Sequence, residues 1–147
     1  MSPSDPDARI AKMKDGRTHL AHKAEHAVDL TSGALLALTL PAADQGDTTT
    51  IQPTLGEAQA AAREINQQGV EEVVADKGLS QRCCAARCPQ ETRSYIPEPE
   101  RGRRKWGEGK AEEQQRTYAN RRRVRGARNK RLQKLRSELT ERSFAHL

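Results

Sequence analysis

The stretch TLGEAQAAAREINQQGVEEVVADKG, residues 54–78, decides the fold, because it reads as a helix followed at once by a strand. Thr54 stands three residues before Glu57, the spacing of a capping box that satisfies first-turn amides. One apolar stripe then recurs at intervals of three and four residues, formed by Leu55, Ala58, Ala62 and Ile65. Gly69 supplies a natural helix end. The pattern predicts a helix over residues 54–68.

A short strand is predicted directly after this helix, over about Val70 to Ala75, where Val73 and Val74 are β-branched. Upstream, residues 18–40 read as a β-hairpin. Apolar and polar residues alternate from Leu20 to Val28, a turn signal follows, and a second apolar run ends at Pro41. Arg93 to Ile96 reads as a further brief strand. We therefore predict an α/β class, with the 70–75 strand beside the hairpin.

The composition supplies little material for a core. Of 147 residues, 34% are hydrophobic, 3% aromatic and 31% charged, which predicts one small core and long solvated stretches, partly disordered. The longest apolar patch, residues 34–40, is far shorter than the roughly 18 residues that span a membrane. The N-terminal residues 1–17 are polar and read as a loop or tail, with no apolar segment typical of a secretion signal.

Three cysteines, Cys83, Cys84 and Cys88, cluster in a segment without a clear period, residues 79–92. Their odd number and close spacing do not fit a disulfide framework. A zinc site is not favoured either, because the histidines lie far away in the sequence. Free thiols in a poorly ordered segment are the expectation.

Charge is distributed very unevenly along the chain. Residues 101–136 hold 15 Lys and Arg against three acids, a local charge of +12, within an overall charge of +6. Such a segment favours binding of a polyanion, and Trp106 and Tyr118 either stack on unpaired bases or pack on the core. Contacts to this polyanion, which the resemblance described below implies is DNA, are predicted at Arg101, Arg103, Arg104, Lys105, Arg121, Arg122, Arg123, Arg125, Arg128, Lys130 and Arg131.

Two carboxylates stand out as candidates for chemistry. Asp76 follows the predicted 70–75 strand, at the end where open α/β sheets present ligands; alternatively it only caps the next turn. Glu141 follows the basic segment, and by periodicity alone it is a solvated helix acid. Hard cations such as Mg²⁺ prefer carboxylate oxygens, so these two acids would suit a divalent metal if the fold brought them together.

Several blocks of the sequence, in order, resemble one known family. They are SPSDPDARIAKMKDGRTHLAHKAEHAVDLTSG, ADQGDTTT, EEVVADKG, RSYIPEPERGRRKW, YANRRRVRG and ELTERSFAHL. The chain resembles bacterial insertion-sequence transposases of the DDE type, and the likeness covers nearly its whole length. It departs from the family pattern after DKG, where residues 79–92 replace an expected apolar helix. That lapse is the pattern that two compensating frameshifts leave.

The resemblance implies a partial ribonuclease H-like catalytic core over residues 18–100, after the 1–17 tail. A basic DNA-contacting segment, residues 101–147, ends in the catalytic-glutamate block. Asp76 and Glu141 stand where the family has its second aspartate and its glutamate. They would hold Mg²⁺ or Mn²⁺ for DNA strand cleavage and strand transfer.

The family's first aspartate lies before the block at which this chain starts. The chain therefore reads as truncated at both ends and inactive by itself. The implied partners are insertion-sequence ends and target duplex, with a homodimer on DNA as one arrangement, in a cytoplasmic, nucleoid-associated location. Two other interpretations stay open: a small basic non-catalytic nucleic-acid-binding protein, and a decayed reading frame, which residues 79–92 favour.

Overall fold

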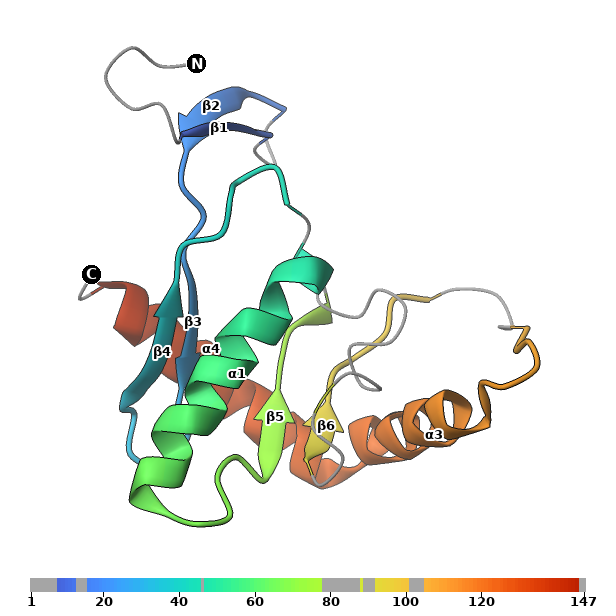
Figure 1. The fold of residues 1–147 in the computed structure, drawn as a ribbon. Coiled ribbons are helices and arrows are strands. Elements are labelled where there is room, and N and C mark those ends of the chain that lie inside the picture. Colours follow the sequence, from blue (N-terminus) through green and yellow to red (C-terminus); the bar gives the residue numbers. More distant parts are fainter. Residues whose placement is uncertain are drawn as a thin grey trace.

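The computed structural model describes residues 8–12, 16–45, 47–77, 88, 92–100 and 105–145, and within them the chain is a mixed α/β protein (Figure 1). The described residues form three two-stranded sheets and three helices. In chain order the elements are β1 (Arg9–Lys12), β2 (Thr18–Ala21), β3 (Glu25–Val28), β4 (Leu35–Thr39), α1 (Asp47–Ile65), β5 (Glu72–Val74), β6 (Arg93–Tyr95), α3 (Ala111–Arg125) and α4 (Ala127–Ala145).

The predicted hairpin is present as β3 and β4, which pair antiparallel. Its turn is held by the Asp29 carboxylate, which accepts hydrogen bonds from the Ser32 amide at 2.9 Å and the Ser32 hydroxyl at 2.5 Å. Gly33 closes the turn at φ +76°, a value that other residues rarely adopt. The hairpin predicted over residues 18–40 is therefore confirmed in its second half.

The first half of that prediction is wrong, because the chain does not continue as one strand from Leu20 to Val28. β2 ends at Ala21 and pairs instead with β1. β1 lies within residues 1–17, which were predicted to be a loop or tail. The β1–β2 ladder stands apart from the body of the molecule (Figure 1). The alternation was real, but it runs across two strands that belong to different sheets.

The predicted helix is also present, but the capping box at Thr54 is wrong. α1 begins at Asp47, so Thr54 lies inside the helix. The Thr54 hydroxyl bonds the Thr39 hydroxyl at 2.6 Å and the Glu25 carboxylate at 3.2 Å. Because its partners are on the β3–β4 hairpin, this hydroxyl joins the helix to the hairpin and does not start the helix.

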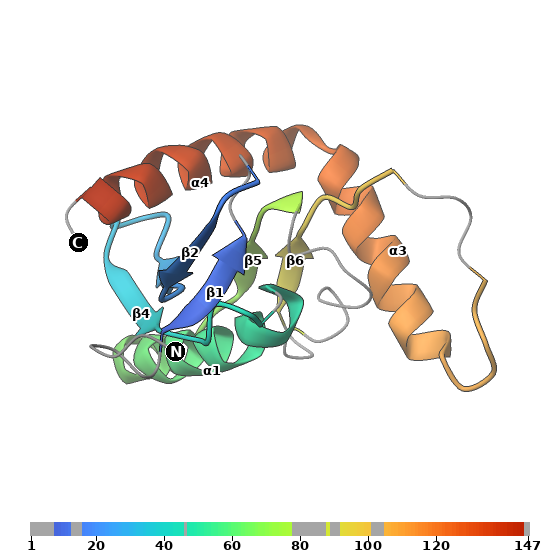
Figure 2. The same ribbon diagram turned by 90° about the horizontal axis from the view of Figure 1, so that it is seen from above.

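The strand predicted at 70–75 is confirmed as β5, at residues 72–74. It pairs in parallel with β6, and in the described part of the chain no ladder joins it to the hairpin. Seen from above, the strands of the body lie between α1 on one side and α4 on the other (Figure 2). The small core around β5 and β6 consists of Ile51, Val73, Ala75, Cys88 and Ile96.

Gly126 separates α3 from α4, and Asn120 fastens α3 to Ile96, directly after β6. The Asn120 side chain is 1% exposed. Its Oδ1 accepts from the Ile96 amide at 3.1 Å, and its Nδ2 donates to the Ile96 carbonyl at 2.9 Å. The side-chain amide thus forms two hydrogen bonds with the Ile96 backbone, as a neighbouring strand of a ladder would.

We predict that Asn120→Ala destabilises the chain by about 2–4 kcal/mol, because it removes two hydrogen bonds and leaves a buried amide and carbonyl without partners. Gln115→Ala, at an exposed position of α3, should change the free energy of unfolding by less than about 0.5 kcal/mol. Urea denaturation followed by circular dichroism measures both. Equal effects of the two substitutions would contradict the anchoring role.

Candidate functional site

A large cavity, about 1130 Å³, lies between the hairpin and β5. Residues of β3 and β5 form two of its walls, and residues of α1 and α4 form the other two. We call this cavity the slot. Asp76 lines the slot directly after β5, where the sequence placed a candidate carboxylate.

Asp76 is exposed, and its Oδ1 accepts a hydrogen bond from the Lys77 amide at 2.6 Å. That contact is the turn-capping role which the sequence left open as the alternative. It occupies one carboxylate oxygen, so the other oxygen is available to a cation or a donor from a ligand. Position and exposure thus allow both roles for Asp76.

Glu141 lies elsewhere on the molecule. It is exposed on α4, where it accepts a hydrogen bond from the Ser137 hydroxyl at 3.4 Å, and it is not among the residues that line the slot. Gln133 of the same helix bonds the Ala75 carbonyl, next to Asp76. Glu141 is eight residues further along, about 12 Å at the rise of an α-helix.

Asp76 lines the slot and Glu141 does not, so a joint metal site at these two carboxylates stays a prediction. Within the described ranges no group of three or more His, Cys, Asp or Glu side chains is placed to hold a metal ion. Cys88 is buried in the core, while Cys83 and Cys84 lie outside the described residues.

The predicted DNA-contacting residues fall into two groups, and the first is used inside the protein. Arg121 makes a bidentate contact with Glu98, at 2.7 Å for the shortest pair. Arg123 donates to the Ser94 carbonyl at 3.0 Å, and Arg128 donates to Glu72 at 2.7 Å. These three guanidinium groups hold α3 and α4 to the segment around β5 and β6.

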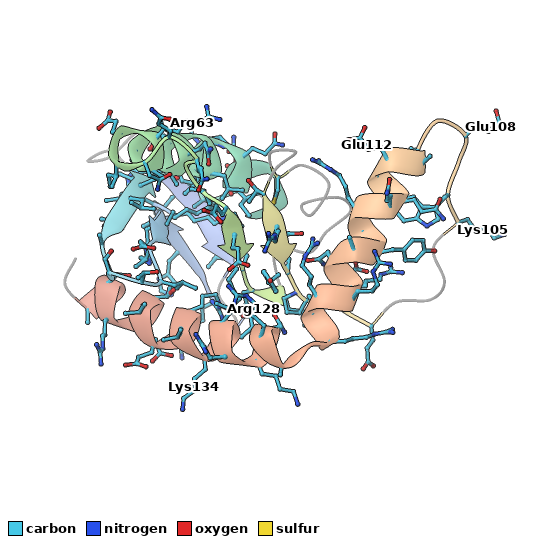
Figure 3. All side chains as sticks on the ribbon, turned by 90° about the horizontal axis from the view of Figure 1, so that it is seen from below. Arg63, Lys105, Glu108, Glu112, Arg128 and Lys134 are labelled. Carbon is cyan, nitrogen blue, oxygen red and sulfur yellow. The ribbon has the colours of Figure 1, made fainter. Side chains whose placement is uncertain are left out.

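The second group is solvent-exposed and forms no ion pair with another described residue. We call it the basic helical surface, and it consists of Arg122, Arg125, Lys130, Arg131 and Lys134. Figure 3 shows Lys134, which the sequence analysis did not single out, pointing away from α4 on the side opposite Arg63 of α1. Lys105 is exposed too, whereas Arg101, Arg103 and Arg104 lie outside the described residues.

Trp106 and Tyr118 contact each other, with ring centroids 6.3 Å apart and planes inclined at 57°. The Arg121 guanidinium lies 5.4 Å from the centroid of the Tyr118 ring. Trp106 is half-buried, while 42% of Tyr118 is exposed. The rings therefore pack on each other where the chain enters α3 and are not part of the core around β5 and β6.

Glu72 is a polar junction that the sequence analysis did not find. The hydrogen bond from Arg128 lowers the pKa of its carboxyl. Partial burial raises this pKa, and the hydrogen bond from the Tyr95 hydroxyl, at 3.1 Å, lowers it. Arg93 lies 3.9 Å away. No local signal marks Glu72, because its partners come from β6 and α4, far along the chain.

Comparisons with known proteins give no relative: no family model, no curated protein and no solved structure matches this chain. None of the helices in the described ranges has the length and apolar character needed to cross a membrane.

Glu72 should make stability depend on acid. Because its pKa is lower in the folded state than in the unfolded state, its contribution is present above its ordinary pKa, near 4.5, and is lost as the pH falls through the folded value. We predict that Glu72→Gln lowers the Tm at pH 7, and that wild type and variant converge as the pH falls below the lowered pKa of Glu72. Glu71→Gln, at an exposed neighbouring position, is the matched control. A Tm difference that persists unchanged at pH 3 would contradict this assignment.

The basic helical surface should bind duplex DNA without sequence preference and with strong dependence on salt. Arg122→Ala with Arg125→Ala is expected to reduce the slope of log K against log salt by up to about 2. Arg63→Ala, on α1, should leave the slope unchanged. Fluorescence anisotropy with a labelled duplex from 50 to 200 mM salt, about the range over which such contacts weaken, measures it. Equal slopes for the double variant and wild type would rule out this surface.

Proposed function

We propose that the chain is part of a DDE-type insertion-sequence transposase, with a partial ribonuclease H-like catalytic domain. In this proposal Asp76 and Glu141 are two of its catalytic carboxylates, and Mg²⁺ or Mn²⁺ is the metal. The substrate is DNA, held at the basic helical surface, and the reaction class is strand cleavage and strand transfer. The isolated chain is inactive in this proposal.

The observation that carries the proposal is the position of the ADKG block. Asp76 follows a parallel strand, is exposed and lines the slot, which suits a carboxylate that meets a ligand at a strand end. The order hairpin, helix, parallel strand and basic helices is compatible with the resemblance that the sequence blocks suggested. The mixed α/β class is consistent with the proposal.

Asp76 lines the slot, and Glu141 is an exposed residue of α4. Two Mg²⁺ ions bring four positive charges, of which two carboxylates offset half. We therefore assign the first metal contact to Asp76.

Divalent metal binding and DNA nicking test the proposal separately. The chain alone should bind Mn²⁺ weakly, and Asp76→Asn should reduce that binding at least tenfold. Asp44→Asn, at another exposed position, should not. Electron paramagnetic resonance of free Mn²⁺ measures the binding. Mn²⁺ binding that survives Asp76→Asn unchanged would remove Asp76 from the site.

In a strand-nicking assay with Mg²⁺ or Mn²⁺, the chain alone is expected to give no robust cleavage. When a segment carrying a third carboxylate is added to its N-terminus, cleavage should appear, and Glu141→Gln should abolish it while DNA binding stays. Glu138→Gln, one turn earlier on α4, is the control. Robust nicking by the unextended chain would show that a different set of acids acts.

A non-catalytic nucleic-acid-binding protein is the second candidate, and one observation favours it. The described residues expose cations on α3 and α4 that form no ion pair with another described residue, and they place no group of three or more potential metal ligands together. This candidate predicts the same salt-dependent binding without any effect of Asp76→Asn on metal affinity. The Mn²⁺ experiment therefore separates the two.

A further inference from the structure

The β4 strand forms an open edge of the hairpin sheet. Within the described residues β4 pairs with β3 alone, and Figure 1 shows no described strand on its other side. An open edge presents N–H and C=O groups that another strand can bond, so proteins usually protect it with charged residues or proline. β3, β5 and β6 each contain a charged residue, namely Glu25, Glu72 and Arg93. β4, with the sequence LLALT, contains neither a charge nor a proline.

Leu38 directs its backbone groups to this open edge. At the hairpin turn, the Asp29 amide bonds the Ala34 carbonyl on the β4 side. Bonded and unbonded residues alternate along β3, so the backbone of Ala27 bonds β4 and that of His26 does not. His26 lies opposite Leu38, and both residues of an unbonded pair turn their N–H and C=O groups outward. The register shift of the hairpin lies nearer the turn and leaves this end of β4 regular.

The two faces of β4 differ in the side chains that they carry. Ala37 is 7% exposed, and the Thr39 hydroxyl bonds α1, so α1 covers the face to which these two small residues belong. Alternation places Leu36, Leu38 and Leu40 on the other face. Leu38 is 41% exposed and Leu40 is 66% exposed. These leucines form an apolar strip directly beside the open edge.

This edge is complementary to itself. The segment Leu36-Ala37-Leu38-Thr39-Leu40 has leucine at its centre and at both ends, with small residues between. When two copies pair antiparallel about a twofold axis at Leu38, Leu38 lies opposite its own copy and Leu36 lies opposite Leu40. Ala37 then lies opposite Thr39 on the other face. Leucine therefore meets leucine, small residues meet small residues, and no like charges are brought together.

The positive charge of the chain does not oppose this pairing. Most of the basic residues belong to residues 101–136, and Figures 1 and 2 both show α3 on the side of the molecule away from β4. A second copy also lengthens the sheet from two strands to four, which is a more stable size for a sheet. The symmetric leucine pattern therefore favours a second copy over an unrelated strand as the partner.

We propose that β4 binds β4 of a second copy of this chain, antiparallel about a twofold axis at Leu38. The two hairpins join into one sheet in the order β3, β4, β4, β3, with α1 of both copies on the same face. The N–H and C=O groups of Leu38 bond their counterparts in the other copy. This inference does not depend on the proposed DNA chemistry.

Charged substitutions at the twofold axis test the proposal with the full chain, free of DNA and metal. Leu38→Lys and Leu38→Glu each place like charges opposite each other and should raise the dimer Kd by about tenfold or more. An equimolar mixture of the two variants should regain association, because Lys meets Glu across the axis. Leu20→Lys, at a leucine of β2 that is 49% exposed, is the matched control and should leave the Kd unchanged. Sedimentation equilibrium over a range of concentrations measures all four samples.

Hydrogen exchange of the unsubstituted chain is an independent test, and it decides the matter if the variants fail to fold. The Leu38 amide should exchange more slowly as the protein concentration rises, because dimerisation gives it a hydrogen-bond acceptor. Amides of α3, on the other side of the molecule, should show no such dependence on concentration.

Three results would overturn the proposal. A chain that stays monomeric at every concentration does not pair through β4. A dimer in which the Leu38 amide is not protected, or whose Kd is unchanged by both charged substitutions, uses another surface. Folded Leu38→Lys and Leu38→Glu variants that do not associate when mixed would place residue 38 away from the axis. All of these readings are made without DNA or Mn²⁺, so failure here is distinct from failure of the proposed function.

Discussion

The body of this protein depends on polar side chains that bond the backbone of distant strands. Asn120 takes both the amide and the carbonyl of Ile96, and Gln133 donates to the carbonyls of Ala75 and Tyr95 at 3.1 Å each. With 3% aromatic residues, apolar burial alone gives these helices few large contacts. Hydrogen bonds with buried partners fix their positions because the bonds are costly to leave unmade.

The same constraint explains why arginine is so abundant in the basic helices. Arg121, Arg123 and Arg128 neutralise acids or bond carbonyl oxygens around β5 and β6, while their neighbours on the outer side of the helices stay exposed. Some arginines of this segment thus hold the helices to the strands, while others are exposed and can attract a polyanion. The number of Lys and Arg residues in this segment is therefore larger than the number of side chains available to contact DNA.

Much of the local structure could be predicted from the sequence, because it rests on short-range signals. The β3–β4 turn, the apolar stripe of α1 and the valine run of β5 are each marked by adjacent residues. The long-range parts could not. The docking of α1 on the hairpin depends on the contact between the Thr54 and Thr39 hydroxyls, and the pairing of β5 with β6 joins segments about twenty residues apart.

The candidate site shows the same division. A carboxylate after a strand was predictable at Asp76 from the local pattern, and its exposure agrees with that position. The relation of Asp76 to Glu141 depends on how α4 crosses the strands, which no local pattern contains. Glu72 escaped notice for the same reason, since Arg128 and Tyr95 reach it from other elements.

α4 also determines how far apart two sheets of the fold lie. Gln133 bonds the Ala75 carbonyl after β5, and Ser143 bonds the His26 ring of β3 at 2.8 Å. These two bonds set the separation of the β3–β4 and β5–β6 sheets, which share no ladder in the described structure. A helix keeps length and phase together: one inserted residue adds about 1.5 Å and turns everything beyond it by roughly 100°. The number of residues between Gln133 and Ser143 therefore sets the spacing between the two sheets. An insertion between them keeps both contacts on the same side of the helix only if it adds close to a whole number of helical turns.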